Sequence, residues 1–465
     1  MSKKKVILLS FFILIILIFY IGSTIGTSKF QGVKKLVPDQ LKVFLNKTIF
    51  VVPSLKKEIM RNRAYMNEVD NRVRKYENLQ SINGFLFEDL ILVTDEKTSN
   101  YRLKKYIFNA NFIKGESILL NDKTPRRPAG YLGMTQDKIL IISGKGTINY
   151  FNKSNIFKKK IELFEVKSNL SEFLNKDEDF FLDYQIGVRD ILIKENFLYL
   201  SFNNLKKENC YNIPILRAPL NFDQLNFEIF FDYSECIQVE KIQKFFVNQS
   251  GGRIVDYSGN EILFSTGAMR AYYKDESQKI ILEQSDESKF GKVLKINLDT
   301  VTDEIFTKGH RNPQGLYVNK KRGIVLETEH GPKGGDEINL LKEKFNYGWP
   351  ISSYGVHYDG KFRENAPLHK SHKDYGFEEP LKYWTPGIGI SQLDRSIESE
   401  QKILVTSMKN ESIHIFSFDD KFNKIEDYDT LRVGQRIRDI VTDLNGNRYI
   451  LILEDPGMIG ILSQI

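Results

Sequence analysis

From about residue 81 onward the chain is a succession of short, strand-like apolar runs separated by Gly, Asn, Asp and Lys, with few convincing helices between them. This texture is typical of an all-β sandwich, barrel or propeller. Residues 291–297 and 412–418 are followed by partner runs at 304–308 and 426–431, which is the hairpin pattern of outer strands in a propeller blade. The other strong runs are 85–94, 138–143, 197–201, 261–265, 323–328, 402–407 and 448–453.

A weaker internal repeat supports a propeller. Arg189-Asp190 and Arg438-Asp439 each stand at the start of an apolar strand-like run. The innermost strands of a propeller line a central channel, so charged residues that open these strands face one another or a ligand. Residues 81–465 divided by six give roughly 64 residues per blade, a reasonable length for four strands and their loops. The sequence therefore predicts one six-bladed β-propeller over residues 81–465.

The N-terminal segment predicts a membrane anchor. Three lysines, at positions 3–5, precede an apolar stretch at 6–25 that is about long enough for one bilayer crossing. No A-x-A-like cleavage site follows, so a signal anchor over residues 1–26 is preferred to a cleaved signal peptide. Lysines at 29, 34 and 35 weaken the orientation signal. An exported body, on the periplasmic side of a bacterial inner membrane, is the default expectation.

Residues 27–80 form the expected connection between anchor and body. The mixed, basic segment 27–52 indicates a membrane-proximal linker. From Leu55 to Tyr76, residues that are apolar except for Asn62 recur at alternating spacings of four and three, which is the a/d stripe of about three heptads. This pattern predicts a short amphipathic helix. It either packs on the body, which is the preferred interpretation, or self-associates, and the oligomeric state stays open.

Charge is distributed unevenly along the chain. Residues 1–80 hold 15 Lys and Arg against 5 Asp and Glu, a net of +10, which leaves 52 against 55, a net of −3, for residues 81–465. The basic excess therefore belongs to the N-terminal arm, and the body offers no electrostatic case for binding nucleic acid. The chain has only two cysteines, Cys210 and Cys236. In an exported body they are expected to form a disulfide, with two buried thiols as the alternative.

The densest group of special-purpose residues lies at 309–355. Pro313 disfavours a helix at the preceding residue, so Arg311 and Asn312 are presented from an extended corner. Farther along, four acidic residues, a histidine and a Gly-Pro corner fall within eleven residues, which suits a hard cation or, more simply, a solvated acidic loop. The acidic residues are Glu327, Glu329, Asp336 and Glu337, and they are accompanied by His330, Gly331 and Pro332.

Several enzyme classes lose support on motif grounds. The chain contains no G-x-S-x-G, Walker loop, strand-borne G-x-G-x-x-G or H-E-x-x-H segment. All six histidines lie in the last third of the chain, and His369 and His372 are expected to be surface loop residues. Four cations stand beside turns or strand starts and can converge on an anionic ligand if the blades bring them together. They are Arg311, Lys409, Arg436 and Arg438.

Six segments together closely resemble the glucose/sorbosone dehydrogenase family. They read GHRNPQGL at 309–316, TEHGPKGGDEINL at 328–340, NYGWP at 346–350, SYG at 353–355, WTP at 384–386 and RIRD at 436–439. The resemblance is strong from about residue 245 to 465 and faint from 80 to 245. It implies a six-bladed propeller that uses pyrroloquinoline quinone and calcium to oxidise a sugar or other alcohol and passes the electrons to an acceptor.

The resemblance also implies roles for matching residues. Arg311 and Asn312 would contact the quinone oxygens, and the backbone carbonyls of Gly331 and Pro332 would hold the calcium. A polar contact would come from Thr385. The carboxylates of the cofactor would be bound by Lys409, Arg436 and Arg438. Calcium and arginine stabilise charge on a quinone oxygen as it accepts a hydride, so the set is chemically coherent.

One departure from the family pattern concerns the general base. The family carries a histidine in a segment Asn-His-x-Gly-Gly-Arg-Leu, and the matching run 248–254 reads Asn-Gln-Ser-Gly-Gly-Arg-Ile, with Gln249 in the place of the histidine. An amide can orient a hydroxyl but cannot take its proton near neutral pH. The family's following Gly-Asp is Gly267-Ala268 here. His310 or His330 could replace the base only if the channel has an unusual geometry.

Three functions therefore compete. The leading one is a membrane-anchored sugar or alcohol dehydrogenase that uses pyrroloquinoline quinone and calcium. The second is a catalytically inactive propeller that binds a carbohydrate or the quinone. The weakest is a glycoside hydrolase built on a pair of the acidic residues between Glu327 and Glu337.

Overall fold

The computed structural model describes residues 84–96, 100–107, 130–174, 187–241, 246–269, 281–454 and 457–465. The chain divides into two units, Met1–Lys75 and Tyr76–Ile465, and every described residue belongs to the second. The predicted anchor (1–26) and the linker and helix (27–80) lie outside the described residues. Within the described part of the chain, no helix is both long and apolar enough to cross a membrane.

The regular secondary structure of the described residues is almost entirely β-strand, which confirms the all-β prediction. Six sheets of four or five strands are described, together with a small sheet of three strands. The first three large sheets contain β3 (Tyr131–Met134), β4 (Lys138–Ile142), β5 (Ile148–Asn152), β6 (Phe164–Ser168) and β12 (Gln224–Leu225); β7 (Val188–Lys194), β8 (Phe197–Phe202), β11 (Ile215–Pro219) and β13 (Glu228–Phe231); and β15 (Gly251–Asp256), β16 (Glu261–Thr266), β17 (Lys292–Asn297) and β18 (Asp303–Lys308).

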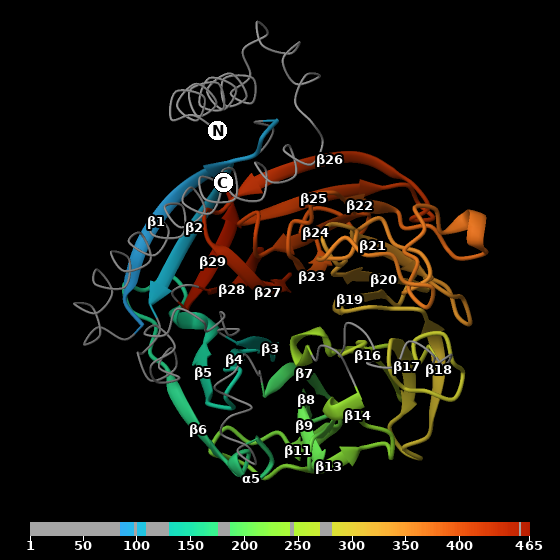
Figure 1. Cartoon of the computed structure of the whole chain (residues 1–465). Helices are drawn as coiled ribbons and strands as arrows, with labels where there is room; N and C mark the ends of the chain where they lie inside the picture. The colour runs from blue at the N-terminus through green and yellow to red at the C-terminus, as the bar shows by residue number, and fades with distance from the viewer. Residues whose placement is uncertain are drawn as a thin grey trace, which may run out of the picture. The chain divides into compact units, whose positions relative to one another are not determined.

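The last three large sheets complete the ring (Figure 1). They contain β19 (Pro313–Asn319), β20 (Ile324–Glu329), β21 (Asp336–Leu341) and β22 (Lys382–Trp384); β23 (Ile390–Arg395), β24 (Lys402–Ser407), β25 (Ser412–Phe418) and β26 (Ile425–Arg432); and β27 (Arg436–Asp443), β28 (Arg448–Glu454), β29 (Met458–Gln464), β2 (Asn100–Ile107) and β1 (Leu86–Val93). The small sheet contains β9 (Asn204–Lys207), β10 (Cys210–Asn212) and β14 (Ile237–Gln238). The described helices are short: α5 (Ser171–Leu174), η4 (Lys153–Asn155), η5 (Val239–Lys241), η6 (Val247–Gln249) and η7 (Lys373–Tyr375).

All seven strand-like runs that the sequence showed without a hairpin partner correspond to strands. Six of them are the second strand of a large sheet, counted from the centre of the ring: β4, β8, β16, β20, β24 and β28. These strands are buried on both faces, as in β28, where every residue is buried. A strand buried on both sides needs a nearly continuous apolar run, which explains why sequence reasoning finds it first.

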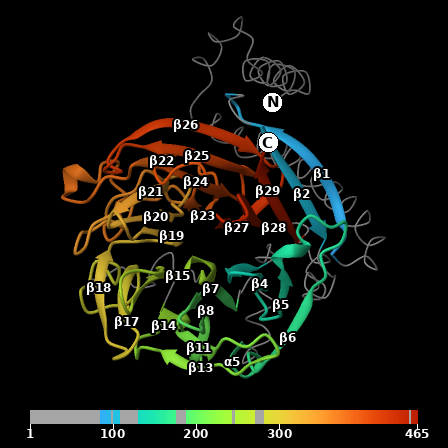
Figure 2. The same ribbon diagram turned by 180° about the vertical axis from the view of Figure 1, so that it is seen from behind.

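The first strands of the large sheets meet around a common centre. Neighbouring members of the series β3, β7, β15, β19, β23 and β27 are in contact, and β27 contacts β3, so the series closes on itself. The view from behind shows the same circular succession (Figure 2). Closure depends on pairing between distant parts of the chain, because β2 pairs with the C-terminal β29 in the sheet that starts at β27.

Five of these six inner strands carry a register irregularity near their start, in β7, β15, β19, β23 and β27. Such bulges bend a strand and redirect its side chains. They occur beside Arg189, Arg253, Gln314, Gln392 and Arg438, the polar residues that open the strands. The bulges therefore supply a local reason why large polar side chains occupy the centre of the molecule.

The predicted disulfide between Cys210 and Cys236 is confirmed. It joins β10 to the segment just before β14, within the small three-stranded sheet. Closing a loop of this length is expected to stabilise the fold by about 3 kcal/mol.

Candidate functional site

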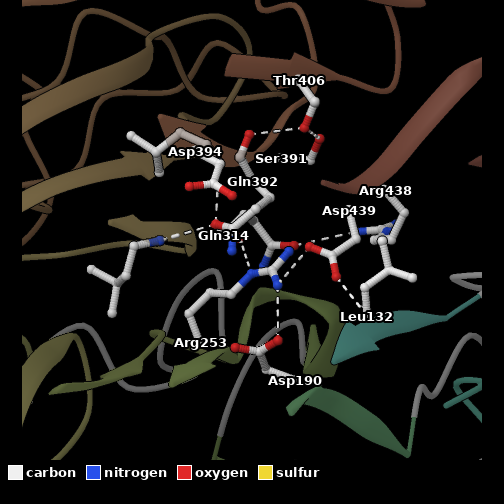
Figure 3. A network of polar contacts seen from close by, with 12 residues as sticks. Leu132, Asp190, Arg253, Gln314, Ser391, Gln392, Asp394, Thr406, Arg438 and Asp439 are labelled. Carbon is white, nitrogen blue, oxygen red and sulfur yellow. Dashed lines mark hydrogen bonds and ion pairs between the residues drawn. The ribbon is translucent and has the colours of Figure 1, made fainter. Parts of the chain in front are cut away.

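A buried polar network fills the centre of the ring (Figure 3). Arg253 Nη1 on β15 lies 2.8 Å from Asp190 Oδ1 on β7 and 2.9 Å from Asp439 Oδ1 on β27. Arg253 Nε donates to the carbonyl of Gln314 on β19 at 2.5 Å. The two Arg-Asp repeats of the sequence thus meet, because their aspartates share one guanidinium. A single side chain connects four inner strands.

Burial dominates the electrostatics of this network. It raises the pKa of Asp190 to about 6, although Arg253 opposes the shift, and it also raises the pKa of Asp439. Gly252 allows β15 to approach β7 this closely, since a Cβ at that position would lie 2.3 Å from the Cβ of Arg189. Close packing against β7 therefore explains the glycine before Arg253 in the Gly-Gly-Arg motif, independently of the family pattern.

A chain of hydrogen bonds leads from this network toward the predicted cofactor residues. Arg438 Nη1 donates to Gln314 Oε1 at 3.3 Å, and Gln314 Nε2 donates to Asn312 Oδ1 at 2.9 Å. The backbone N–H of Gly251 donates to the same Asn312 oxygen at 3.2 Å. Asn312 and Arg438 are therefore brought together, and along this chain Asn312 is one hydrogen bond and Arg438 three hydrogen bonds from Gly251, two residues after Gln249.

Arg436 and Arg438 share one carboxylate. Arg438 Nε donates to Glu454 Oε1 at 2.7 Å and Arg436 Nε donates to Glu454 Oε2 at 3.1 Å. Burial alone would raise the pKa of Glu454, but the two guanidinium groups reverse this effect and lower it. The carboxylate therefore stays ionised and holds both arginines side by side at the start of β27.

Arg311 points at the Gly-Pro corner. Its Nη1 donates to the carbonyls of His330 and Gly331 at 2.8 and 2.7 Å, and its guanidinium lies 5.3 Å from the centre of the Trp349 ring. The backbone N–H of Arg311 donates to Glu329 Oε2 at 2.8 Å. Arg311 is only 5% exposed, so the surrounding groups hold it firmly.

Asp336 organises the Gly-Pro corner. Its Oδ1 accepts from the backbone N–H of Gly331 at 3.2 Å, and its Oδ2 accepts from that of Gly389 at 2.7 Å. The two carbonyls predicted as calcium ligands already accept hydrogen bonds. Arg311 donates to Gly331, and the Tyr358 hydroxyl donates to Pro332 at 3.1 Å. A carbonyl has two lone pairs, so each oxygen retains one.

Thr385 and Lys409 lie beside the same corner but are exposed. Gly334, in the turn that precedes Asp336, approaches Thr385 so closely that an added Cβ would lie 3.3 Å from its side chain. Lys409 Nζ donates to the carbonyl of Gly387 at 3.1 Å. Next to it, Met408 Sδ accepts from Arg436 Nη2 at 3.5 Å.

Gln249 ends η6 and is buried. Its carbonyl accepts a hydrogen bond from the backbone N–H of Met269. The carbonyl of Ser250 accepts one from the backbone N–H of Gly267. The segment that carries Ala268 therefore runs directly beside Gln249. The backbone N–H of Ala268 also donates to the carbonyl of Arg311 at 2.8 Å, which joins this pair of segments to the predicted cofactor residues.

The structure bears on two expectations about histidines: the surface position of His372, and the use of His310 or His330 as a replacement base. The prediction of a surface position for His372 is wrong: its ring is buried, with Nδ1 3.0 Å from the Tyr347 carbonyl and Nε2 3.5 Å from Glu337 Oε1. His310 is completely buried, so it cannot reach a substrate. His330 is partly exposed, and burial lowers its pKa to about 4, with Arg311 and the arginines of β27 acting in the same direction.

The four acidic residues between Glu327 and Glu337 are also buried, none more than 4% exposed. The alternative of a solvated acidic loop is therefore wrong, and a glycosidic bond could not reach a carboxylate pair here. A narrow cleft borders Glu329 and Glu337, together with Arg311 and Trp349. Its interior of about 10 Å³ accommodates little more than one water molecule.

Sequence reasoning missed two polar residues and underrated a third. Gln314 lies inside the GHRNPQGL segment, so its motif could have singled it out. Asp336 was assigned only to an acidic group, although its position after two glycines hinted at a turn. Glu454 gave no signal, because only the fold brings the end of β28 next to the two arginines of β27.

Comparisons with known proteins agree with this architecture. The model of the family described as Glucose / Sorbosone dehydrogenase matches residues 127–461. The aldose sugar dehydrogenase YliI of Escherichia coli is 36% identical over 160 residues, which cover 33% of this chain and 42% of that protein. The uncharacterized protein slr1608 of Synechocystis is 31% identical over 194 residues, or 38% and 46% of the two chains. The chain therefore spans less than half the length of these curated relatives.

Solved structures share the propeller fold. The soluble aldose sugar dehydrogenase of Escherichia coli in its apo form gives a TM-score of 0.56 at 20% identity, over 73% of this chain and 97% of that one. The aldose sugar dehydrogenase of Streptomyces coelicolor in its PQQ-bound form gives 0.53 at 19% identity, over 74% and 96%. The family resemblance read from the sequence is confirmed: this protein belongs to the glucose/sorbosone dehydrogenase family.

Proposed function

We propose that the protein binds pyrroloquinoline quinone at the Arg311 end of its propeller and oxidises an aldose sugar or another alcohol, with transfer of the electrons to an acceptor. The six large sheets act as six blades in this proposal. The observation that carries it is the convergence of Asn312, Arg436 and Arg438 through the hydrogen bonds of Asn312, Gln314 and Glu454, with Arg311 next to Asn312 in the chain.

The donor set fits an anionic quinone. Guanidinium groups bind carboxylates in bidentate fashion, and Arg436 and Lys409 keep part of their surface exposed beside the buried Arg438. Trp349 adds an aromatic surface next to Arg311. When bound, the quinone supplies the hydride acceptor. The protein's own residues bind its carboxylates, orient its oxygens through Arg311 and Asn312, and exclude water from the buried side.

Calcium fits the Gly331-Pro332 corner only if the Arg311 side chain moves away from it. Each carbonyl has a lone pair left, but the Arg311 guanidinium lies 2.7 Å from the Gly331 oxygen and would repel a dication there. Calcium therefore requires Arg311 to turn away from Gly331. A turn toward the quinone oxygens would satisfy the guanidinium and release the carbonyl in one movement.

A second candidate function follows from Gln249 and Ala268. Both positions lack a titratable side chain, and the backbone N–H of Met269, the residue after Ala268, donates to the carbonyl of Gln249. Loss of a base and of the acid beside it suits a propeller that binds the quinone or a carbohydrate without turnover. In either function we propose that the N-terminal segment anchors the protein and that the body is exported, since residues 6–25 are apolar and the body contains a disulfide.

The test uses the full-length chain in detergent, with calcium and pyrroloquinoline quinone added. Quinone binding is measured by equilibrium titration, and aldose oxidation by reduction of an electron-accepting dye. We expect binding that weakens at least about tenfold in Arg436→Gln, because one charge-assisted contact is lost. A matched control is Arg432→Gln, an exposed arginine at the end of β26.

The outcomes separate the two functions. Turnover by the unaltered chain supports the dehydrogenase. Tight binding without turnover, with turnover restored by Gln249→His, supports the inactive propeller. Absence of quinone binding overturns the assignment of Arg311, Lys409, Arg436 and Arg438 together.

A further inference from the structure

Two adjacent strands of the fourth large sheet carry four polar side chains on one buried face. Glu327 pairs with Asn339 and Glu329 pairs with Glu337 across the β20–β21 ladder. Residues two apart on a strand share a face, so all four lie on the same side. Their exposed fractions are 0–4%. Like charges directly opposite one another destabilise a sheet, and burial increases the cost.

His310 approaches this face from the loop that follows β18 of the neighbouring sheet. One ligand atom each from His310, Glu327 and Glu329 lies within 4.8 Å of the others. The imidazole is held in place because its Nε2 lies 2.8 Å from Thr307 Oγ1 and its ring stacks on Tyr347 at a centroid distance of 5.0 Å. This leaves Nδ1 pointing at the carboxylates, 3.9 Å from Glu329 Oε2.

Three of the polar atoms that converge here have no hydrogen-bond donor. Among the described residues, His310 Nδ1, Glu327 Oε1 and Asn339 Oδ1 are buried and have no hydrogen-bond partner. Asn339 Nδ2 donates to the other oxygen of Glu327 at 3.0 Å, which fixes its own oxygen as an acceptor. Within the described ranges, no lysine or arginine forms an ion pair with Glu327. One proton on Glu327 could satisfy one neighbour, whereas a cation would satisfy all of them.

We propose that His310, Glu327 and Glu329 bind a divalent metal ion, with Asn339 Oδ1 as an additional oxygen donor. A set of one imidazole and two carboxylates is typical of first-row transition ions such as Mn²⁺ or Zn²⁺, whereas Ca²⁺ takes oxygen ligands. Thr307 would hold the Nε2–H tautomer and leave Nδ1 free for the metal.

This site is separate from the Gly331-Pro332 corner and does not depend on the quinone. It uses side chains between two sheets, not backbone carbonyls. Its effect reaches the cofactor residues through Glu329, whose Oε2 also accepts from the backbone N–H of Arg311. The ion would therefore position Arg311 by fixing both the preceding residue and the carboxylate that holds its backbone.

The test is metal analysis of the full-length chain, purified in detergent without a polyhistidine tag, chelator or added quinone. We expect roughly one manganese or zinc ion per chain in the unaltered protein and its loss in Glu327→Gln. Glutamine mimics a protonated glutamate, so a site that holds only a proton would tolerate this change. Glu283→Gln, an equally buried glutamate outside the cluster, is the matched control and should retain the metal.

A second measurement covers the case in which Glu327→Gln does not fold. Chelator-treated unaltered protein should gain about 2 °C or more in Tm when Mn²⁺ or Zn²⁺ is added, and His310→Gln should lose this gain. Equal metal content in the unaltered chain and Glu327→Gln, or no metal-dependent change in Tm, overturns the site. Neither of these results would contradict the proposal that the quinone binds at Arg311, because that proposal is tested separately by quinone titration.

Discussion

Gln249 and Ala268 occupy adjacent, buried positions, and neither side chain can act as an acid or a base near neutral pH. The hydrogen bond from Met269 N–H to the Gln249 carbonyl fixes their neighbourhood independently of any family comparison. An imidazole at 249 would need an acid at 268 to set its tautomer and orientation. The two positions are therefore expected to act as a pair, and changing both together measures their coupling.

This coupling is testable through stability alone. Ala268→Asp buries a carboxylate at a position that is 0% exposed, and we expect it to destabilise the protein by roughly 2 kcal/mol or more. In the double variant with Gln249→His the new imidazole can pair with it, so the combined cost should fall short of the sum by about 1–3 kcal/mol. Chemical denaturation of the four proteins measures the cycle. Additive effects would mean that the two side chains do not meet.

At the level of single strands, bulges in the backbone determine which polar side chains face the centre of the ring. Bulges near the starts of the inner strands place Arg253 and Arg438 in the centre, whereas uninterrupted second strands such as β24 and β28 form the apolar body of each sheet. Outer strands carry polar residues with local roles. His414 on β25 is one of them, because its Nδ1 lies 2.7 Å from the Tyr428 hydroxyl on β26.

His414 predicts a pH effect on stability. Burial, helped by Lys382, lowers its pKa in the folded protein to about 4, whereas an unfolded histidine has a pKa of about 6.5. Between these values the unfolded chain binds a proton that the folded chain does not, so the free energy of unfolding falls as the pH drops from about 6.5 to 4. Glutamine cannot titrate but can still bond to Tyr428.

We therefore expect His414→Gln to remove roughly 3 kcal/mol of that fall. Melting curves of both proteins across this pH range make the comparison, and the difference between them isolates His414 from other titrating groups. Parallel curves for the two proteins would contradict the prediction. His369→Gln, at a half-buried loop histidine, serves as a control for the substitution.

The closure of the ring is a property of the whole unit from Tyr76 to Ile465. It depends on the pairing of β2 with β29 at the outside and on Arg253 at the centre. Removing one partner of a buried ion pair leaves an uncompensated charge, which costs more than replacing the whole group. Arg253 faces two aspartates, so its loss leaves two such charges.

Arg253→Met should therefore lower the Tm by roughly 5 °C or more. Adding Asp190→Asn and Asp439→Asn to this variant should recover a large part of the loss, because no buried charge is then left without a partner. Thermal melting of the single and triple variants in the same detergent decides this. A triple variant that is less stable than the single one would show that the aspartates have other partners.

The sequence by itself determined the class of fold and the family. Apolar runs of strands buried on both faces are local patterns, and segments such as GHRNPQGL and RIRD name the family without any coordinates. The cofactor candidates were also readable, because their residue types carry charge and hydrogen-bonding groups that suit an anionic quinone. The missing histidine at 249 is likewise a fact of the sequence.

Only the tertiary structure decided which of these groups meet and which are accessible. Burial of His372 and of the acidic residues near 330 depends on loops and sheets that pack over them, and a local polar pattern reads as a surface loop until that packing is known. The partnership of Glu454 with two arginines, and of Arg253 with aspartates on two other sheets, arises from closure of the ring. His310 and Glu327 are 17 residues apart in sequence, one in the loop after β18 and the other on β20 of the next sheet, so their convergence could be seen only after the sheets were placed side by side.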